Sequence, residues 1–114
     1  MKRFLAVITL VFMLAAPALA LSDAEFLRMK KNNADFARAD RRLNQVWAQL
    51  KKNTSRAVFR ILSDEQNEWV EWGRDSDAKA YMNEGYSRVE AYTMATSDRA
   101  DYLPGRAREI ARGR

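Results

Sequence analysis

Apolar residues recur every three or four positions in three stretches of the chain, with polar residues between them. This spacing places the apolar side chains on one face of an α-helix, and no stretch shows the alternation typical of a strand. The pattern predicts helices over residues 23–52, 56–82 and 88–103. Their inner faces comprise Met29, Phe36, Ala39, Leu43, Val46, Trp47 and Leu50, then Phe59, Leu62, Gln66, Trp69, Val70 and Gly73, then Val89, Tyr92, Thr96, Ala100 and Leu103.

Local signals mark where these helices begin and bend. Residues 22–25 and 87–90 both read Ser-x-x-Glu, a capping box in which the two side chains bond free backbone amides at a helix start. Thr54 or Ser55 is the expected cap of the middle helix, because hydroxyl oxygens accept hydrogen bonds from first-turn amides. Two consecutive asparagines, residues 32–33, are expected to bend the first helix.

Glycine and proline mark the helix ends. Gly85 is expected to end the middle helix, because glycine readily adopts the left-handed conformation found after helices. Pro104 and Gly105 are expected to end the third helix. The connections are short, so neighbouring helices should run antiparallel. The sequence thus predicts an all-α fold, a three-helix up-down-up antiparallel bundle with a long hairpin of the first two helices.

The segment before the first helix has the pattern of a secretory signal peptide. A positive start, Met1-Lys2-Arg3, precedes an uncharged apolar run over residues 4–16, and the small-residue string Ala18-Leu19-Ala20 follows. The apolar run is shorter than the roughly 20 residues that span a bilayer, so it does not predict a stable membrane anchor. We expect residues 1–20 to be cleaved and the helical domain to act in the periplasm or as a secreted protein.

Net positive charge is confined to the two ends of the chain. The chain has 20 basic and 15 acidic residues, and removal of Lys2 and Arg3 leaves 18 and 15, a charge of +3. Residues 106–114 carry four arginines and one glutamate, also +3, so the predicted helical domain, residues 21–105, is formally neutral. A neutral body does not favour nucleic acid as a partner. The basic C-terminal tail, residues 106–114, is expected to be a frayed, solvated terminus, and contact with an anionic surface is the alternative.

Residue types that most catalytic and metal sites need are missing. The chain has no histidine and no cysteine, which removes the commonest general base, the thiol nucleophile, the soft metal ligands and any disulfide. Its four glycines are scattered and form no phosphate-binding loop. We therefore expect a protein that is not an enzyme, has no cofactor or metal, and is stabilised by helix packing.

An acidic face runs along the predicted middle helix. Asp64, Glu68, Glu71 and Asp75 are spaced by four, three and four residues, which at about 100° per residue aligns them opposite the inner face. A solvated helix face explains this pattern, and a docking surface for a basic protein partner is the functional alternative. Trp72 lies at the edge of this face, where it either anchors a partner or covers the third helix.

Four polar residues fall on or near the inner faces of the first two helices. Asp40, Asn44 and Gln66 are expected to form a hydrogen-bonded set that links these helices, with Arg74 within reach, because buried polar groups need partners. Setting the register of the hairpin is the favoured role of this set. A ligand site is the alternative.

Several of these residues together resemble the LprI-like family of small exported bacterial proteins. The family has an A-D-x-x-L-N-x-x-(aromatic) segment on one helix and a Q-x-x-W-x-x-x-R-D segment on the next. In this sequence one more residue separates the tryptophan from the arginine. The resemblance is carried by residues 39–47 (ADRRLNQVW), Leu50, Leu62, Gln66, Trp69, Arg74, Asp75 and residues 96–103.

The resemblance implies a helical exported domain, with a lysozyme as the protein partner because inhibition of lysozyme has been proposed for a member. It also implies that relatives usually carry cysteines that pair between the second and third helices, where this chain has Ala78 and Ala91. We expect a non-catalytic, lysozyme-inhibitor-like protein that acts by steric occlusion through its middle helix. The alternative is a structural or envelope-stress module that binds a protein or an anionic surface through the basic tail. The oligomeric state is left open.

Overall fold

The computed structural model describes residues 20–113, and no strand occurs within them. The all-α prediction is confirmed. The elements are α2 (Asp23–Asn32), α3 (Ala34–Asn53), α4 (Arg56–Glu68), the π-helical segment η4 (Trp69–Gly73), α5 (Arg74–Asn83) and α6 (Arg88–Ala111). The predicted signal peptide, residues 1–20, lies outside the described residues except for Ala20.

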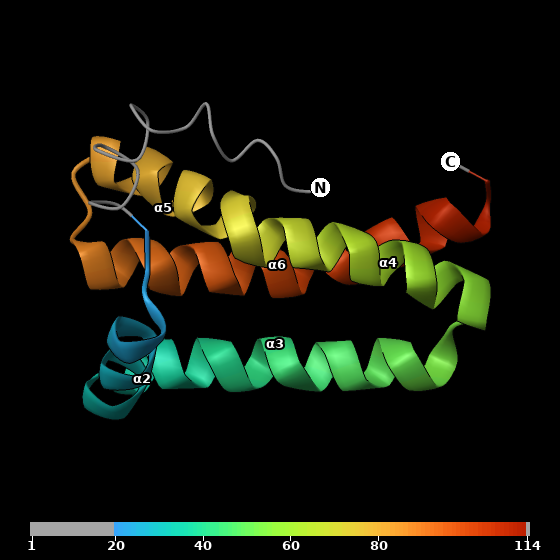
Figure 1. Cartoon of the computed structure of the whole chain (residues 1–114), viewed down its shortest axis with the longest axis horizontal. Helices are drawn as coiled ribbons and strands as arrows, with labels where there is room; N and C mark the ends of the chain where they lie inside the picture. Colours follow the sequence, from blue (N-terminus) through green and yellow to red (C-terminus); the bar gives the residue numbers. More distant parts are fainter. Residues whose placement is uncertain (1–19, 114) are drawn as a thin grey trace, which may run out of the picture.

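The first predicted helix is two helices that meet at Asn33. Ser22 and Glu25 form the predicted capping box, with the Glu25 amide donating to the Ser22 hydroxyl oxygen at 3.1 Å. Asn33 has an extended backbone, and its side-chain amide donates to the Met29 carbonyl at 3.1 Å. This bond satisfies a carbonyl at the end of α2 and competes with continued helix. The expected bend is therefore a break, and α2 lies across the end of α3 (Figure 1).

The middle helix continues through α4, η4 and α5 but contains one π turn. Ser55, rather than Thr54, caps its start. In η4 the Arg74 amide donates to the carbonyl of Trp69, five residues earlier instead of four. The π turn thus takes up one extra residue, the same residue by which this sequence exceeds the LprI-like spacing. Because of it, Trp69 before the turn and Ala78 after it are both buried.

The third predicted helix is longer than expected. α6 continues through Pro104 and Gly105 to Ala111, so the prediction that these two residues end the helix is wrong. Proline removes one backbone hydrogen bond, but beyond it Ala107 and Ile110 are only 5% and 9% exposed and join the core. Their burial offsets the lost bond. The expectation of a frayed tail is also wrong for residues 106–111.

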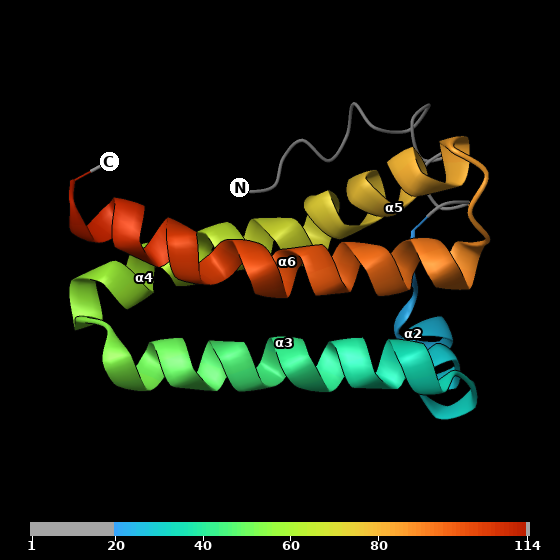
Figure 2. The ribbon, with the colours of Figure 1, turned by 180° about the vertical axis from the view of Figure 1, so that it is seen from behind.

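α6 lies between α3 and α5 (Figures 1 and 2). Figure 1 shows that the chain direction alternates from α3 to the α4–α5 helix and again to α6. α3 packs mainly on α6, and α6 contacts α5 more extensively than α4. The expected hairpin of the first two helices is therefore a connection and not the main interface, because α6 supplies apolar surface to both.

Two apolar clusters form the core. Ala78 and Ala91, which stand where the resemblance implies cysteines in relatives, are fully buried in the cluster that also contains Phe36 and Tyr92. Among residues 20–113, no helix has the continuous apolar length that a bilayer span requires. The first cluster comprises Leu43, Leu62, Trp69, Ala100, Leu103, Ala107 and Ile110, and the second comprises Leu21, Met29, Phe36, Ala78, Ala91 and Tyr92.

Candidate functional site

An exposed surface runs along α4 and η4. Trp72 is 70% exposed, so it does not cover the third helix. Ile61, an apolar residue of α4, is exposed as well, and so are Asp64, Glu68 and Glu71, three of the four predicted acidic residues. We refer to Ile61, Asp64, Glu68, Glu71 and Trp72 together as the α4–η4 surface.

Asp75 lies on a different side of the helix. The π turn adds a residue without advancing the helical phase, so residues after Gly73 are rotated by about 100° relative to an uninterrupted α-helix. Asp75 is partly buried, and its Oδ1 accepts hydrogen bonds from the Tyr92 hydroxyl at 2.5 Å and from the Leu21 amide at 3.2 Å. It therefore belongs to the interior contacts of the bundle and not to the exposed face where the sequence placed it.

Tyr92 keeps the proton that it donates to Asp75. Burial, and then the hydrogen bond to the Asp75 carboxylate, raise the pKa of Tyr92 well above its ordinary value. The Arg88 guanidinium lies 5.3 Å from the Tyr92 ring centre. The hydroxyl of Tyr92 is therefore a permanent donor at physiological pH.

The four polar residues predicted near the inner faces line one cavity. This cavity of about 280 Å³ lies between α3 and the middle helix, and Asp40, Asn44, Gln66 and Arg74 form its polar lining. They do not form the single hydrogen-bonded set that the sequence predicted. Asn44 donates to Asp40 at 3.3 Å within α3, whereas Gln66 accepts from Arg99 of α6 at 2.8 Å.

Two of these residues are held by α2. The buried Asp40 carboxylate pairs with Lys30 of α2 at 3.0 Å. The Arg74 guanidinium lies 5.6 Å from the ring centre of Phe26, and its buried Nε has no hydrogen-bond partner among residues 20–113. The polar residues of the cavity thus attach α2 and α6 to the middle of the bundle, which is a structural role.

Contacts between α4 and α6 involve residues that sequence reasoning missed. Arg106 pairs with Glu65 at 2.6 Å, and this hydrogen-bonded pair lowers the pKa of Glu65. The Arg99 guanidinium carbon lies 5.4 Å from the Trp69 ring centre and 4.9 Å from that of Tyr102. Burial lowers the pKa of Arg99. The two arginines are seven residues apart, two helical turns, and this spacing was the available signal that the helix continues past the proline.

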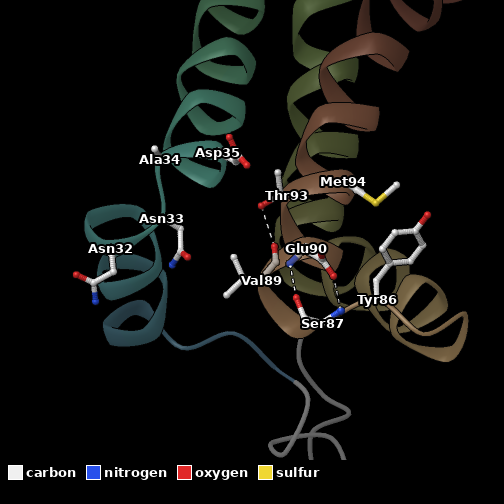
Figure 3. A pocket seen from close by; sticks show the side chains of 10 residues that line it. All are labelled: Asn32, Asn33, Ala34, Asp35, Tyr86, Ser87, Val89, Glu90, Thr93 and Met94. Atoms are coloured by element: carbon white, nitrogen blue, oxygen red, sulfur yellow. Dashed lines mark hydrogen bonds between the residues drawn. The ribbon is translucent and has the colours of Figure 1, made fainter.

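A larger groove, of about 650 Å³, lies between the α2–α3 junction and the start of α6 (Figure 3). Much of its polar lining is engaged within the protein. Ser87 and Glu90 form the predicted second capping box, and the Thr93 hydroxyl donates to the Val89 carbonyl at 2.8 Å. The Asn33 side chain is bound at the end of α2. The groove therefore offers few free groups to orient a ligand, and we assign it no function.

A family relationship covers most of the described chain. No curated protein and no solved structure matches the chain. The model of the family described as lysozyme inhibitor LprI matches residues 28–110, which include all of α3, α4, η4 and α5. The match extends past Gly105, in agreement with the helix that continues there. Since most of its length matches, the chain belongs to the lysozyme inhibitor LprI family.

Proposed function

We propose that the protein is an exported, non-catalytic binding protein that inhibits a lysozyme by occluding it with the α4–η4 surface. The observation that carries the proposal is the 70% exposed side chain of Trp72, which lies beside Glu68 and Glu71 in a chain of the LprI family. A large aromatic side chain exposed in the free protein contributes strongly to affinity when a partner buries it.

Charge supports the α4–η4 surface as the docking face. Many animal lysozymes are strongly basic, so the exposed carboxylates of this surface would steer the encounter. The predicted mature chain has a formal charge of +3, which opposes attraction at long range. Attraction must therefore be local and come from the exposed carboxylates of Asp64, Glu68 and Glu71.

The backbone next to Trp72 is packed within the π turn. A Cβ atom on Gly73 would lie 2.7 Å from Cδ1 of Trp69, so the Trp69 ring packs directly against the backbone beside Trp72. Trp69 is itself buried, and its indole nitrogen donates to Asp77 at 3.1 Å. Backbone that is already packed in the free protein loses little conformational entropy on binding, which favours affinity.

Inhibition by steric occlusion fits the residues of this protein better than a catalytic mechanism does. The sequence has no histidine and no cysteine, and the carboxylates of the α4–η4 surface are exposed to solvent. Within residues 20–113, no three acidic side chains are placed to hold a metal ion. Removal of residues 1–20 during export is part of the proposal, since a lysozyme inhibitor must reach its target outside the cytoplasm.

Replacement of Trp72 by alanine is expected to weaken lysozyme inhibition at least about tenfold, because it removes the central anchor of the proposed interface. The measurement is the residual activity of animal-type and goose-type lysozymes on bacterial cell walls, titrated with the mature protein. Physiological salt screens charge effects beyond about 8 Å.

Leu27→Ala is the matched control, because Leu27 is an apolar side chain on α2 that is 64% exposed. Its truncation should leave inhibition unchanged. Full activity of both lysozymes at a large excess of the unmodified protein would refute the proposal. Equal inhibition by Trp72→Ala and the unmodified protein would show that the α4–η4 surface is not the docking face.

Binding through the basic tail, the alternative function, receives less support. Arg106 pairs with Glu65 of α4 in a partly buried position, and α6 carries the chain as far as Ala111. Arg108 and Arg112 are exposed and keep a small basic surface at this end of α6.

A further inference from the structure

The chain enters the core of the bundle at Leu21. Ala20 is exposed, whereas Leu21 is 7% exposed and packs in the second apolar cluster. The Leu21 backbone nitrogen lies 3.2 Å from Oδ1 of Asp75. The bond between Ala20 and Leu21, where the sequence predicts cleavage, thus joins an exposed residue, whose carbonyl accepts a hydrogen bond from Arg88 at 3.3 Å, to a buried one.

We propose that Asp75 is the binding site for the mature N-terminus. An export-linked endopeptidase would hydrolyse the bond between Ala20 and Leu21, with water supplying the oxygen of the new Ala20 carboxylate. The released Leu21 nitrogen becomes an ammonium group and forms an ion pair with Asp75. The inference rests on the proposed export of the chain and is independent of lysozyme binding.

The contacts of Asp75 allow it to pair with a new ammonium group. Among residues 20–113 its Oδ1 accepts hydrogen bonds from two neutral donors, the Tyr92 hydroxyl and the Leu21 amide, and no basic side chain of these residues forms an ion pair with Asp75. The buried Leu21 side chain holds the nitrogen in place. Partial burial of the carboxylate limits screening by water, so the pair is stronger than one at the surface.

Other charged groups near this site come from α2, α5 and α6. Arg74 and Arg88 act on Tyr92 and would oppose a nearby ammonium group, but Arg88 is paired with Glu25 at 3.2 Å. Tyr92 does not titrate in the range of an α-amino group, because its pKa is raised by burial and by Asp75. Asp75 is thus the group that faces the new N-terminus most directly.

The ion pair makes the stability of the mature protein depend on pH. A counter-ion raises the pKa of an α-amino group above its usual value of about 7.7–8.0. The stabilisation is therefore complete below that range, and it is lost as pH rises through the raised pKa of the folded protein.

Three forms of the chain test the inference. One begins at Leu21 with a free amine, and the second is the same chain acetylated, which keeps the N–H donor and removes the charge. The third begins at Ala20, so its charge is displaced by one residue, about 3.8 Å. At about pH 6 the free Leu21 form is expected to have an unfolding equilibrium constant about tenfold lower than the other two, which corresponds to one pKa unit. The advantage should disappear between about pH 8 and 10.

Asp75→Asn identifies the partner of the ammonium group. In this variant the free and acetylated Leu21 forms are expected to be equally stable at every pH. Equal stability of the two forms without the substitution, or an advantage that survives Asp75→Asn, would overturn the inference. If Asp75→Asn does not fold, the deciding measurement is the stability difference between the free and acetylated Leu21 forms of the unsubstituted chain as a function of pH. Its loss above about pH 8 supports the ion pair, and a difference independent of pH contradicts it.

Discussion

Ending the chain after Gly105 is expected to lower the free energy of unfolding by about 3–5 kcal/mol. The truncation removes the buried side chains of Ala107 and Ile110 from the first apolar cluster. It also removes Arg106 and leaves the partly buried Glu65 without its partner. Denaturant unfolding followed by circular dichroism measures the loss.

A shorter truncation, after Ala111, is the matched control. It removes arginine charge from the same end of the chain but begins at the exposed Arg112, beyond the last buried side chain of α6. The unfolding free energy should stay within about 0.5 kcal/mol of the full mature chain. Similar effects of the two truncations would show that the helix beyond Pro104 is not part of the core. Deletion of residues 106–114 is therefore a poor test of binding through the tail, because unfolding would imitate a loss of binding.

Alanine substitutions at Gly73 and Gly105 are expected to have opposite effects. A Cβ on Gly73 would lie 2.7 Å from Cδ1 of Trp69, whose buried ring cannot withdraw without disturbing the core, so Gly73→Ala should destabilise by about 1–3 kcal/mol. At Gly105 the nearest atom is Nη2 of Arg108, at 3.8 Å. Since Gly105 is helical, its replacement should stabilise by about 0.5–1 kcal/mol.

Denaturant unfolding of the two glycine variants under one set of conditions measures this contrast. A stabilising Gly73→Ala would show that the Trp69 ring does not pack tightly against the π turn. A destabilising Gly105→Ala would contradict the helical conformation assigned to residues after the proline.

Local sequence signals predicted the starts of the helices well. Residues 22–25 and 87–90 form capping boxes as expected, because cap geometry depends on contacts within a few residues. The all-α class followed from periodicity in the same way. The asparagine pair marked the correct place in the first helix, but periodicity alone did not distinguish a bend from the break at Asn33.

Features that depend on distant contacts were not predictable from local patterns. Pro104 is a helix-ending signal by itself, and only the burial of Ala107 and Ile110 against other helices overrides it. The π turn likewise arises because Trp69 and Ala78 must both face the core. The extra residue relative to the LprI-like spacing was the signal for it, since a helix can absorb one inserted residue as a π turn.

Only the part of the candidate site that depends on local periodicity was predicted from the sequence. The exposed positions of Asp64, Glu68 and Glu71 follow from a period of 3.6 residues, since all three precede the end of η4. Asp75 follows the π turn and is therefore out of phase. Asp40 contacts Asn44 as predicted, but Lys30 and Arg99, which also bind Asp40 and Gln66 respectively, come from elements that periodicity did not bring near them.

Docking through the α4–η4 surface is tested most directly by the tryptophan indole NMR signals of the ¹⁵N-labelled mature protein as unlabelled lysozyme is added. Trp72 is exposed, whereas Trp69 is buried and Trp47 packs against the first apolar cluster. We expect the Trp72 signal to shift or broaden until the proteins are equimolar, with much smaller changes for Trp47 and Trp69. An unchanged Trp72 signal in the presence of a lysozyme that the protein inhibits would contradict docking through this surface.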